Sequence, residues 1–278
     1  MSLHSSSSSI TVKSDKDKVS SRRKVDYVID KLGDYPKYVA KWINAPWFPV
    51  IRQDPNFYSF LNHKTLPKEF AESYTAYKEV KSCVRKHVAD KMDSSLKSFL
   101  ADAAVPRDPS YIPPRDILII DMCCGKGFLS VLLAFKFPNA HILMIDNMTK
   151  LNLEHIENLP RIDFWLTSVT ESKFVPELKL KAKDFKSVIV IGIHLCGDLS
   201  EHLLNAFHTL PNASCMVLCP CCISKRKTEL LEKAKLEGIS NYELWSQELL
   251  GMIQPPSKEL KKLTDCSSEK NNFLLACK

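Results

Sequence analysis

Glycine is scarce in this sequence, with only seven glycines among 278 residues. Four of the seven occur as two close pairs, Gly125 with Gly127 and Gly192 with Gly197. Glycine lets the backbone turn sharply or approach a ligand closely. In a chain that uses so little glycine, these two places are the first candidates for a binding site.

Long apolar runs are also absent, and none approaches the roughly 18–20 residues that span a bilayer. We therefore expect no membrane partner. Ten cysteines are present, but a chain of this size does not need a disulfide scaffold. No apolar secretory segment opens the sequence. We expect reduced thiols and a cytoplasmic protein, with the nucleus or an organelle as alternatives if the N-terminus is a targeting segment.

The charge balance is basic, with a net charge of +7. This favours an acidic partner such as RNA, although part of the charge lies near the N-terminus. Residues 1–24 are Ser-rich and basic, which predicts a disordered tail. A transit peptide is the alternative, and Asp15 and Asp17 argue against it.

Residues 25–104 are predicted to form a helical region. From Pro67 onwards, apolar side chains recur every three or four residues, which marks one face of a helix. Residues 105–115 hold four prolines and are predicted to be a linker.

Residues 116–278 have a different pattern, in which β-rich apolar runs alternate with helical patterns. The predicted strands are 116–121, 140–146, 161–167, 187–194 and 214–220, and the predicted helices between them are 128–137, 148–159 and 199–210. Continuous apolar strands separated by helices predict an α/β fold with a doubly wound, mostly parallel sheet of seven strands. Residues 261–278 are predicted to add two antiparallel strands at one edge.

The turn "DMCCGKG", residues 121–127, follows the first predicted strand. Ligands of open α/β sheets bind at the carboxyl ends of the strands, and an acid at the end of the second strand, here Asp146, suits ribose hydroxyls. A dinucleotide site would have a third glycine in phase. Asp121 would repel a pyrophosphate, whereas it suits the ammonium group of S-adenosylmethionine.

Here the sequence resembles the Rossmann-fold methyltransferases that use S-adenosylmethionine. Their first motif is an acid followed by three alternate glycines, which becomes Asp121, Cys123, Gly125 and Gly127 here. The resemblance covers about residues 110–278. It is closest to a branch with "HLCGD" (194–198) and "CPCC" (219–222), which includes the tRNA acceptor-stem ribose methyltransferases.

The resemblance implies S-adenosylmethionine as the cofactor, held by the turn and by the ends of the next two strands. The implied cofactor-binding residues are Asp121, Cys123, Cys124, Gly125, Lys126, Gly127, Asp146, Asn147 and Ser168. Cysteine replaces glycine at position 123, and we expect a side chain there to require a negative φ angle.

His194 and Asp198 are the candidate catalytic residues. Histidine can take up a proton near neutral pH, so His194 could act as a base or orient the acceptor. The alternatives are a hydrogen-bonded histidine that closes a strand and an aspartate that caps the next helix.

The first, fourth and fifth predicted strands should be neighbours, which brings seven side chains to one rim: Cys123, Cys124, His194, Cys196, Cys219, Cys221 and Cys222. The favoured interpretation is that these cysteines are small residues that line a tight pocket. The repeated C-x-x-C spacing of a zinc site is missing, so no metal ligands are predicted. A zinc site and a reactive thiol stay open as alternatives.

The acceptor is predicted to be RNA, with tRNA favoured. The Asp/Asn-Pro-Pro-aromatic motif of nucleobase amino methyltransferases is absent. The basic run 224–227 could contact phosphates or be a solvated helix start. Protein and small-molecule acceptors, an NAD-linked oxidoreductase and a non-catalytic cofactor-binding protein are the alternatives. No obligate protein partner is inferred.

Overall fold

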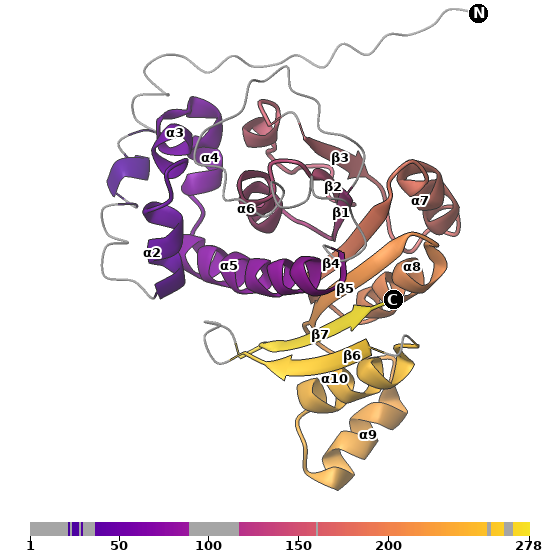
Figure 1. Ribbon diagram of the computed structural model, residues 1–278. Helices are drawn as coiled ribbons and strands as arrows, with labels where there is room; N and C mark the ends of the chain where they lie inside the picture. The colour runs from indigo at the N-terminus through magenta and orange to yellow at the C-terminus, as the bar shows by residue number, and fades with distance from the viewer. Residues whose placement is uncertain are drawn as a thin grey trace, which may run out of the picture.

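The computed structural model describes residues 22, 24–27, 29, 37–88, 117–159, 161–254, 257–263 and 269–278. Within these ranges a twisted sheet forms the centre of the molecule, and helices cover both of its faces (Figure 1). The predicted tail mostly, and the predicted linker wholly, lie outside the described residues. Among the residues that the structure describes, no helix has the length and apolar composition needed to cross a membrane.

The sheet contains seven strands in the order β3-β2-β1-β4-β5-β7-β6. Strands β1 to β5 are parallel, and β7 runs antiparallel to both β5 and β6. The bounds are β1 Ile117–Met122, β2 His141–Asp146, β3 Ile162–Leu166, β4 Ser187–Leu195, β5 Ala213–Pro220, β6 Ser257–Lys262 and β7 Asn272–Cys277. The predicted doubly wound α/β fold is confirmed, including the neighbouring positions of the first, fourth and fifth strands.

The two faces of the sheet have separate hydrophobic cores because side chains alternate along a strand. Ile117 and Ile119 of β1 belong to one core, together with residues of the N-terminal helices and of α6 (Phe128–Lys136). Leu118 and Ile120 belong to the other. That second core includes side chains of α7 (Phe174–Ala182), α8 (Leu199–Thr209) and α10 (Asn241–Met252). Both faces are therefore buried, which explains the continuous apolar strands.

The N-terminal helices pack directly on the first core. They are α2 (Lys37–Ile43), α3 (Phe48–Gln53), α4 (Tyr58–Leu61) and the long α5 (Leu66–Cys83), with the short 3-10 helix η2 (Pro55–Phe57) before α4 and the π-turn η3 (Val84–Val88) after α5. The Trp47 and Phe135 rings stack with centroids 4.5 Å apart, and those of Phe60 and Phe128 are 4.1 Å apart. The helical region and the sheet therefore share one core (Figure 1).

One predicted helix is wrong. Residues 148–159 contain only the 3-10 turn η6 (Glu154–Ile156). The Asn152 side chain accepts a hydrogen bond from the Glu154 amide at 3.4 Å, a local alternative to helical pairing. The closing hairpin is present, but its first strand begins at Ser257 rather than at residue 261. Helices α9 (Thr228–Glu237) and α10 lie between β5 and β6 along the chain.

Candidate active site

The turn after β1 is held in a left-handed conformation. Cys123, Gly125 and Gly127 have φ angles of 56°, 54° and 74°. The expectation of a negative φ at Cys123 is therefore wrong: the cysteine adopts the conformation that favours glycine. Such backbone strain costs on the order of 1–3 kcal/mol and is typical of functional sites. The Cys124 amide donates to the Ile145 carbonyl at 3.1 Å, which ties the turn to β2.

Gly127 starts helix α6 and has two reasons to be glycine. Its φ angle is positive, and an added Cβ would lie 2.4 Å from Cε of Met144. The close contact with β2 lets the helix begin directly above the sheet, so the amides of its first turn face the carboxyl ends of the strands.

Asp146 braces the same turn from the end of β2. Its Oδ2 accepts a hydrogen bond from the Gly125 amide at 2.9 Å, and its Oδ1 accepts one from the Met148 amide at 3.0 Å. Each oxygen retains a lone pair for a further donor. The geometry is compatible with the predicted ribose contact and adds a structural function that the sequence did not indicate.

Asp121 is buried at the carboxyl end of β1. Its Oδ2 accepts a hydrogen bond from Ser130 Oγ at 2.6 Å. Burial raises the pKa of Asp121 to about 7, the Ser130 hydrogen bond opposes this rise, and the nearby Asp146 charge adds to it. A buried carboxylate with this pKa favours a cationic ligand, because a positive charge would offset the cost of burying the negative one.

An open cavity of about 610 Å³ lies over the turn. It is bordered by the predicted residues Asp121, Cys123, Cys124, Gly125, Lys126 and His194. The predicted residues Gly127, Asp146, Asn147, Ser168 and Asp198 are not among its lining residues. Helix α5 and the preceding loop supply an unpredicted wall, formed by His63, Lys68, Glu69, Glu72 and Ser73.

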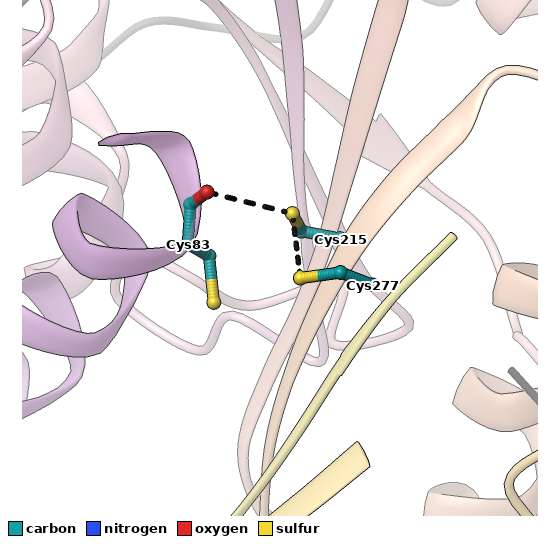
Figure 2. A group of neighbouring side chains, drawn as sticks. All are labelled: Cys83, Cys215 and Cys277. Carbon is teal, nitrogen blue, oxygen red and sulfur yellow. Dashed lines mark hydrogen bonds between the residues drawn. The ribbon is translucent and has the colours of Figure 1, made fainter. Parts of the chain in front are cut away.

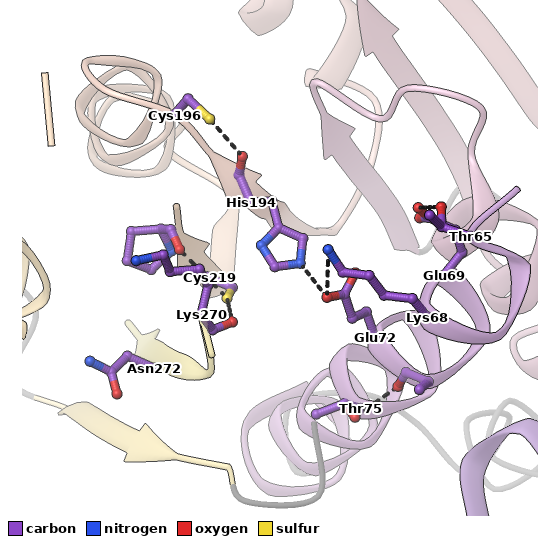
Figure 3. A network of polar contacts seen from close by, with 12 residues as sticks. Thr65, Lys68, Glu69, Glu72, Thr75, His194, Cys196, Cys219, Lys270 and Asn272 are labelled. Carbon is purple, nitrogen blue, oxygen red and sulfur yellow. Dashed lines mark hydrogen bonds and ion pairs between the residues drawn. The ribbon is translucent and has the colours of Figure 1, made fainter. Parts of the chain in front are cut away.

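His194 and Glu72 meet across this cavity (Figure 3). His194 Nε2 lies 3.0 Å from Glu72 Oε1, and the Glu72 side chain is 6% exposed. Lys68 Nζ is 3.7 Å from the same oxygen. Within the described part of the chain, neither His194 Nε2 nor Glu72 Oε1 has a hydrogen-bond partner of good geometry, so this contact is the main polar interaction of each atom.

The backbone at His194 is also strained, with a φ angle of 60° near the end of β4. Only a few per cent of residues other than glycine adopt this conformation, although histidine does so more often than most. The strained residue projects its ring toward α5 and away from the cysteine that follows it, Cys196 (Figure 3). A carboxylate that contacts one ring nitrogen fixes the ring orientation and leaves the other nitrogen to act on a substrate.

The contacts of Asp198 and Ser168 are with residues close to them in the sequence. Asp198 stands at the N-cap position of α8, but among the described residues its side chain makes no capping hydrogen bond. Its carbonyl accepts from the Glu201 amide at 3.0 Å. Ser168 Oγ lies 2.9 Å from Thr170 Oγ1. The structure tests neither predicted role.

The predicted rim of thiols divides into separate groups. The sulfur atoms of Cys196, Cys221 and Cys222 lie within 4.8 Å of one another. Cys219 is buried and points its thiol at the Lys270 carbonyl, 3.4 Å away. Burial raises the pKa of Cys123 to about 12 and that of Cys124 further still, so these two thiols stay protonated. A reactive thiolate at the turn is therefore disfavoured.

A second group of three cysteines was not predicted. Cys83 at the end of α5, Cys215 of β5 and Cys277 of β7 are all buried and meet between α5 and the face of the sheet that it covers (Figure 2). The Cys215 thiol donates to the Cys83 carbonyl at 3.8 Å, and the Cys277 thiol to Cys215 Sγ at 3.0 Å. These contacts join the helical region to both strands.

Comparison with known proteins identifies the kind of domain. Residues 90–229 match a family model described as a methyltransferase domain. A glutathione S-transferase C-terminal domain-containing protein of Xenopus laevis is 22% identical over 156 residues, which are 54% of this chain and 22% of that protein. The chain thus spans less than a quarter of the length of the curated relative that it matches.

Solved structures show remote similarity. The CurJ carbon methyltransferase is 12% identical with a TM-score of 0.43, covering 96% of this chain and 71% of its own. The plantazolicin methyltransferase BpumL, solved with S-adenosylhomocysteine, is 14% identical with a TM-score of 0.41, covering 90% and 97%. A Methanococcus jannaschii fibrillarin pre-rRNA processing protein is 9% identical with a TM-score of 0.42, covering 60% and 68%.

Proposed function

The chain belongs to the methyltransferase-domain family, and from this premise we propose that it transfers a methyl group from S-adenosylmethionine to a hydroxyl group of RNA, with tRNA as the first candidate. S-adenosylmethionine is the cofactor and the enzyme is a methyltransferase. The choice of acceptor and the roles of individual residues are the proposal.

The observation that carries the proposal is the position of the His194–Glu72 pair. It lies on the wall of the cavity that Asp121 and the strained turn also border. In this arrangement Asp121 binds the ammonium group of the cofactor, the turn approaches its methionine end, and Asp146 accepts from the ribose hydroxyls. Asn147 and Ser168 are proposed to lie near the adenine.

The chemistry needs a base on the acceptor side. As the acceptor oxygen attacks the methyl carbon, the carbon–sulfur bond breaks and its electron pair stays on sulfur, which gives S-adenosylhomocysteine. The hydroxyl proton passes to the free nitrogen of His194, and Glu72 stabilises the resulting imidazolium. Proton transfer of this kind contributes typically 10²–10⁴-fold to a rate, and positioning of the two substrates supplies much of the remainder.

An RNA acceptor is supported by charge. The protein carries a net charge of +7, and three lysines, Lys68, Lys126 and Lys270, border the cavity. The basic run 224–227 follows β5, on the same side of the sheet, and Lys225 and Arg226 in it are exposed. Lys227 pairs with Glu201 at 2.8 Å, so it is Lys225 and Arg226 that we assign to phosphate contacts.

We also propose the organisation of the chain. Residues 1–24 form a tail, 25–104 a helical region, 105–115 a linker and 116–278 the methyltransferase domain. The shared core of α5 and the sheet makes the helical region part of the catalytic unit, because Glu72 comes from it. We keep the cytoplasm as the proposed location.

The test is transfer of a tritiated methyl group from S-adenosylmethionine to total RNA, fractionated tRNA and total protein. Label in tRNA that remains in dinucleotides after alkaline hydrolysis is the expected result, because a methylated 2′-hydroxyl cannot attack the neighbouring phosphate. His194→Ala should abolish transfer while leaving S-adenosylhomocysteine binding intact, and Glu72→Gln should lower kcat more than it changes KM.

Two outcomes would overturn parts of the proposal. Label in protein alone would refute the RNA acceptor. Cofactor binding without transfer to any fraction, together with unchanged behaviour of His194→Ala, would favour a non-catalytic binding protein.

A further inference from the structure

Three thiols gather at the carboxyl ends of β4 and β5, next to the cavity. Cys196 lies in the connection from β4 to α8, and Cys221 and Cys222 follow β5 directly. Their sulfur atoms are all within 4.8 Å of one another, and Cys196 and Cys222 are exposed. We propose that Cys196, Cys221 and Cys222 bind one zinc ion at the edge of the cavity.

The spacing of the sulfur atoms suits zinc. Two zinc–sulfur bonds of about 2.3 Å at a tetrahedral angle place their sulfur atoms about 3.8 Å apart. The three sulfur atoms of the Cys196 group are no more than 4.8 Å apart, so they reach this spacing with movements of about 1 Å or less. In the buried group, Cys215 and Cys277 are 3.0 Å apart, closer than two ligands of one zinc ion. Both groups contain a thiol that donates to a carbonyl, Cys215 to Cys83 at 3.8 Å and Cys196 to His194 at 3.7 Å, so the sulfur spacing is what separates them. The buried group is packed as a thiol contact in the core, and it serves here as the comparison.

Backbone hydrogen bonds hold the two ligand segments together. The Gly197 amide donates to the Cys222 carbonyl at 2.8 Å, and the Cys221 amide donates to the Leu195 carbonyl at 3.0 Å. Each bond joins one proposed ligand, Cys222 or Cys221, to a neighbour of the third ligand, Cys196. The three sulfur atoms are therefore brought together by the fold, before an ion binds, and little conformational entropy remains to be lost on binding.

Gly197 allows the turn that brings the two segments together, because its φ angle of 55° favours glycine. An added Cβ would make an ordinary contact, 3.5 Å from Cβ of Ser224, so the backbone conformation is the reason for glycine here. Gly197 therefore belongs to the connection that carries Cys196, whereas Gly192, the other glycine of the pair, packs against Leu195 and Leu203.

The number of ligands indicates an open site. Thiolate sulfur is a preferred ligand of zinc, and sites with three protein ligands keep a fourth position for water or a substrate atom. Cys196 and Cys221 both line the cavity that Asp121 and His194 border. The ion would thus lie where a methyl acceptor enters, although zinc binding itself requires no methyl transfer.

The test uses the full-length reduced protein, stripped of metal with a chelator and titrated with Co²⁺ and then Zn²⁺. One ion per chain and sulfur-to-cobalt charge-transfer absorption, displaced by zinc, are expected. Cys222→Ser should weaken zinc binding by more than about 100-fold, because losing even an outer partner of a ligand costs 10–100-fold. Cys83→Ser, in the buried group, is the matched control and should bind as the unaltered protein does.

Several results would overturn the proposal. They are absence of binding, equal binding by Cys222→Ser, loss of binding in Cys83→Ser instead, and a disulfide among the three cysteines found by mass spectrometry of the protein as isolated. Circular dichroism checks that each variant is folded, and Cys196→Ser replaces Cys222→Ser if the latter is not. The titration contains no methyl acceptor and no S-adenosylmethionine. A failure to bind zinc is therefore distinguishable from a failure of the proposed methyl transfer.

Discussion

The buried carboxylate of Asp121 makes stability and cofactor binding respond in opposite ways to one substitution, Asp121→Asn. Burial raises the pKa of Asp121 from 3.8 to about 7. The folded protein therefore favours the neutral carboxylic acid. The stability that Asp121 contributes is fully present below pH 3.8 and is lost as the pH rises through 7. A difference of about three pKa units corresponds to about 4 kcal/mol at high pH.

Asparagine removes that charge and keeps an oxygen that can accept from Ser130. Its amide N–H groups need partners, and leaving them unmade costs about 1–3 kcal/mol. We therefore expect Asp121→Asn, free of cofactor, to be about 1–3 kcal/mol more stable than the unaltered protein at pH 8.5. At pH 5 the carboxyl is neutral in the folded protein but ionised in the unfolded chain, so the gain is only about 1.6 kcal/mol and the two proteins should differ by about 1 kcal/mol or less.

The assay is urea unfolding at both pH values, followed by thermal unfolding with S-adenosylmethionine. A ligand that binds only the folded state raises the midpoint. The cofactor should stabilise the unaltered protein at pH 8.5 and much less at pH 5, and it should not stabilise Asp121→Asn. Ser130→Ala is the control, because it removes the hydrogen bond that favours the carboxylate and should destabilise more at high pH. Equal destabilisation of Asp121→Asn at both pH values would refute the reasoning.

Three further substitutions test the turn and the helical wall. Cys123→Gly relieves a left-handed conformation worth about 1–2 kcal/mol at an entropic cost of about 0.5–1 kcal/mol, so denaturant unfolding should show a small stabilisation with cofactor binding retained. Gly127→Ala should lose about 1–3 kcal/mol and weaken S-adenosylhomocysteine binding in calorimetry, because its Cβ meets Met144; unchanged binding would contradict the described turn. Trp47→Ala should lose about 3–5 kcal/mol, and the sheet and the helices should still unfold in one transition because they share a core. Two separate transitions would show that they are independent.

The strands were predictable because each is apolar throughout, and the turn because its glycines are so few. The helix predicted at 148–159 is wrong although its apolar residues have helical spacing. That spacing carries no information about the Asn152 side chain, which accepts a hydrogen bond from the Glu154 amide in place of a helical partner. Cys123 shows the opposite limit: residue type suggested a negative φ, and the hydrogen bonds of the surrounding turn imposed a positive one.

Glu72 was missed because its partner is distant in sequence. Its function depends on α5 lying beside the end of β4, which local patterns do not encode. One signal was present: Glu72 lies on a helix whose neighbours Phe70, Ala71 and Ala76 are nearly inaccessible, so most sides of the helix are covered. A carboxylate on such a helix needs a partner, and histidine at a strand end was already a candidate.

Strand β7 lies between β5 and β6 in the sheet. The segment that matches the family model is therefore smaller than the segment needed to complete the sheet. The segment shared with other methyltransferase domains ends at residue 229, within α9. A chain that stopped there would expose the side of β5 that pairs with β7, and one that began at residue 90 would lack the helices that cover one face. Any gene fusion that transplanted this domain would have to carry both flanks with it, and deletions within either flank should be as damaging as deletions within the shared segment.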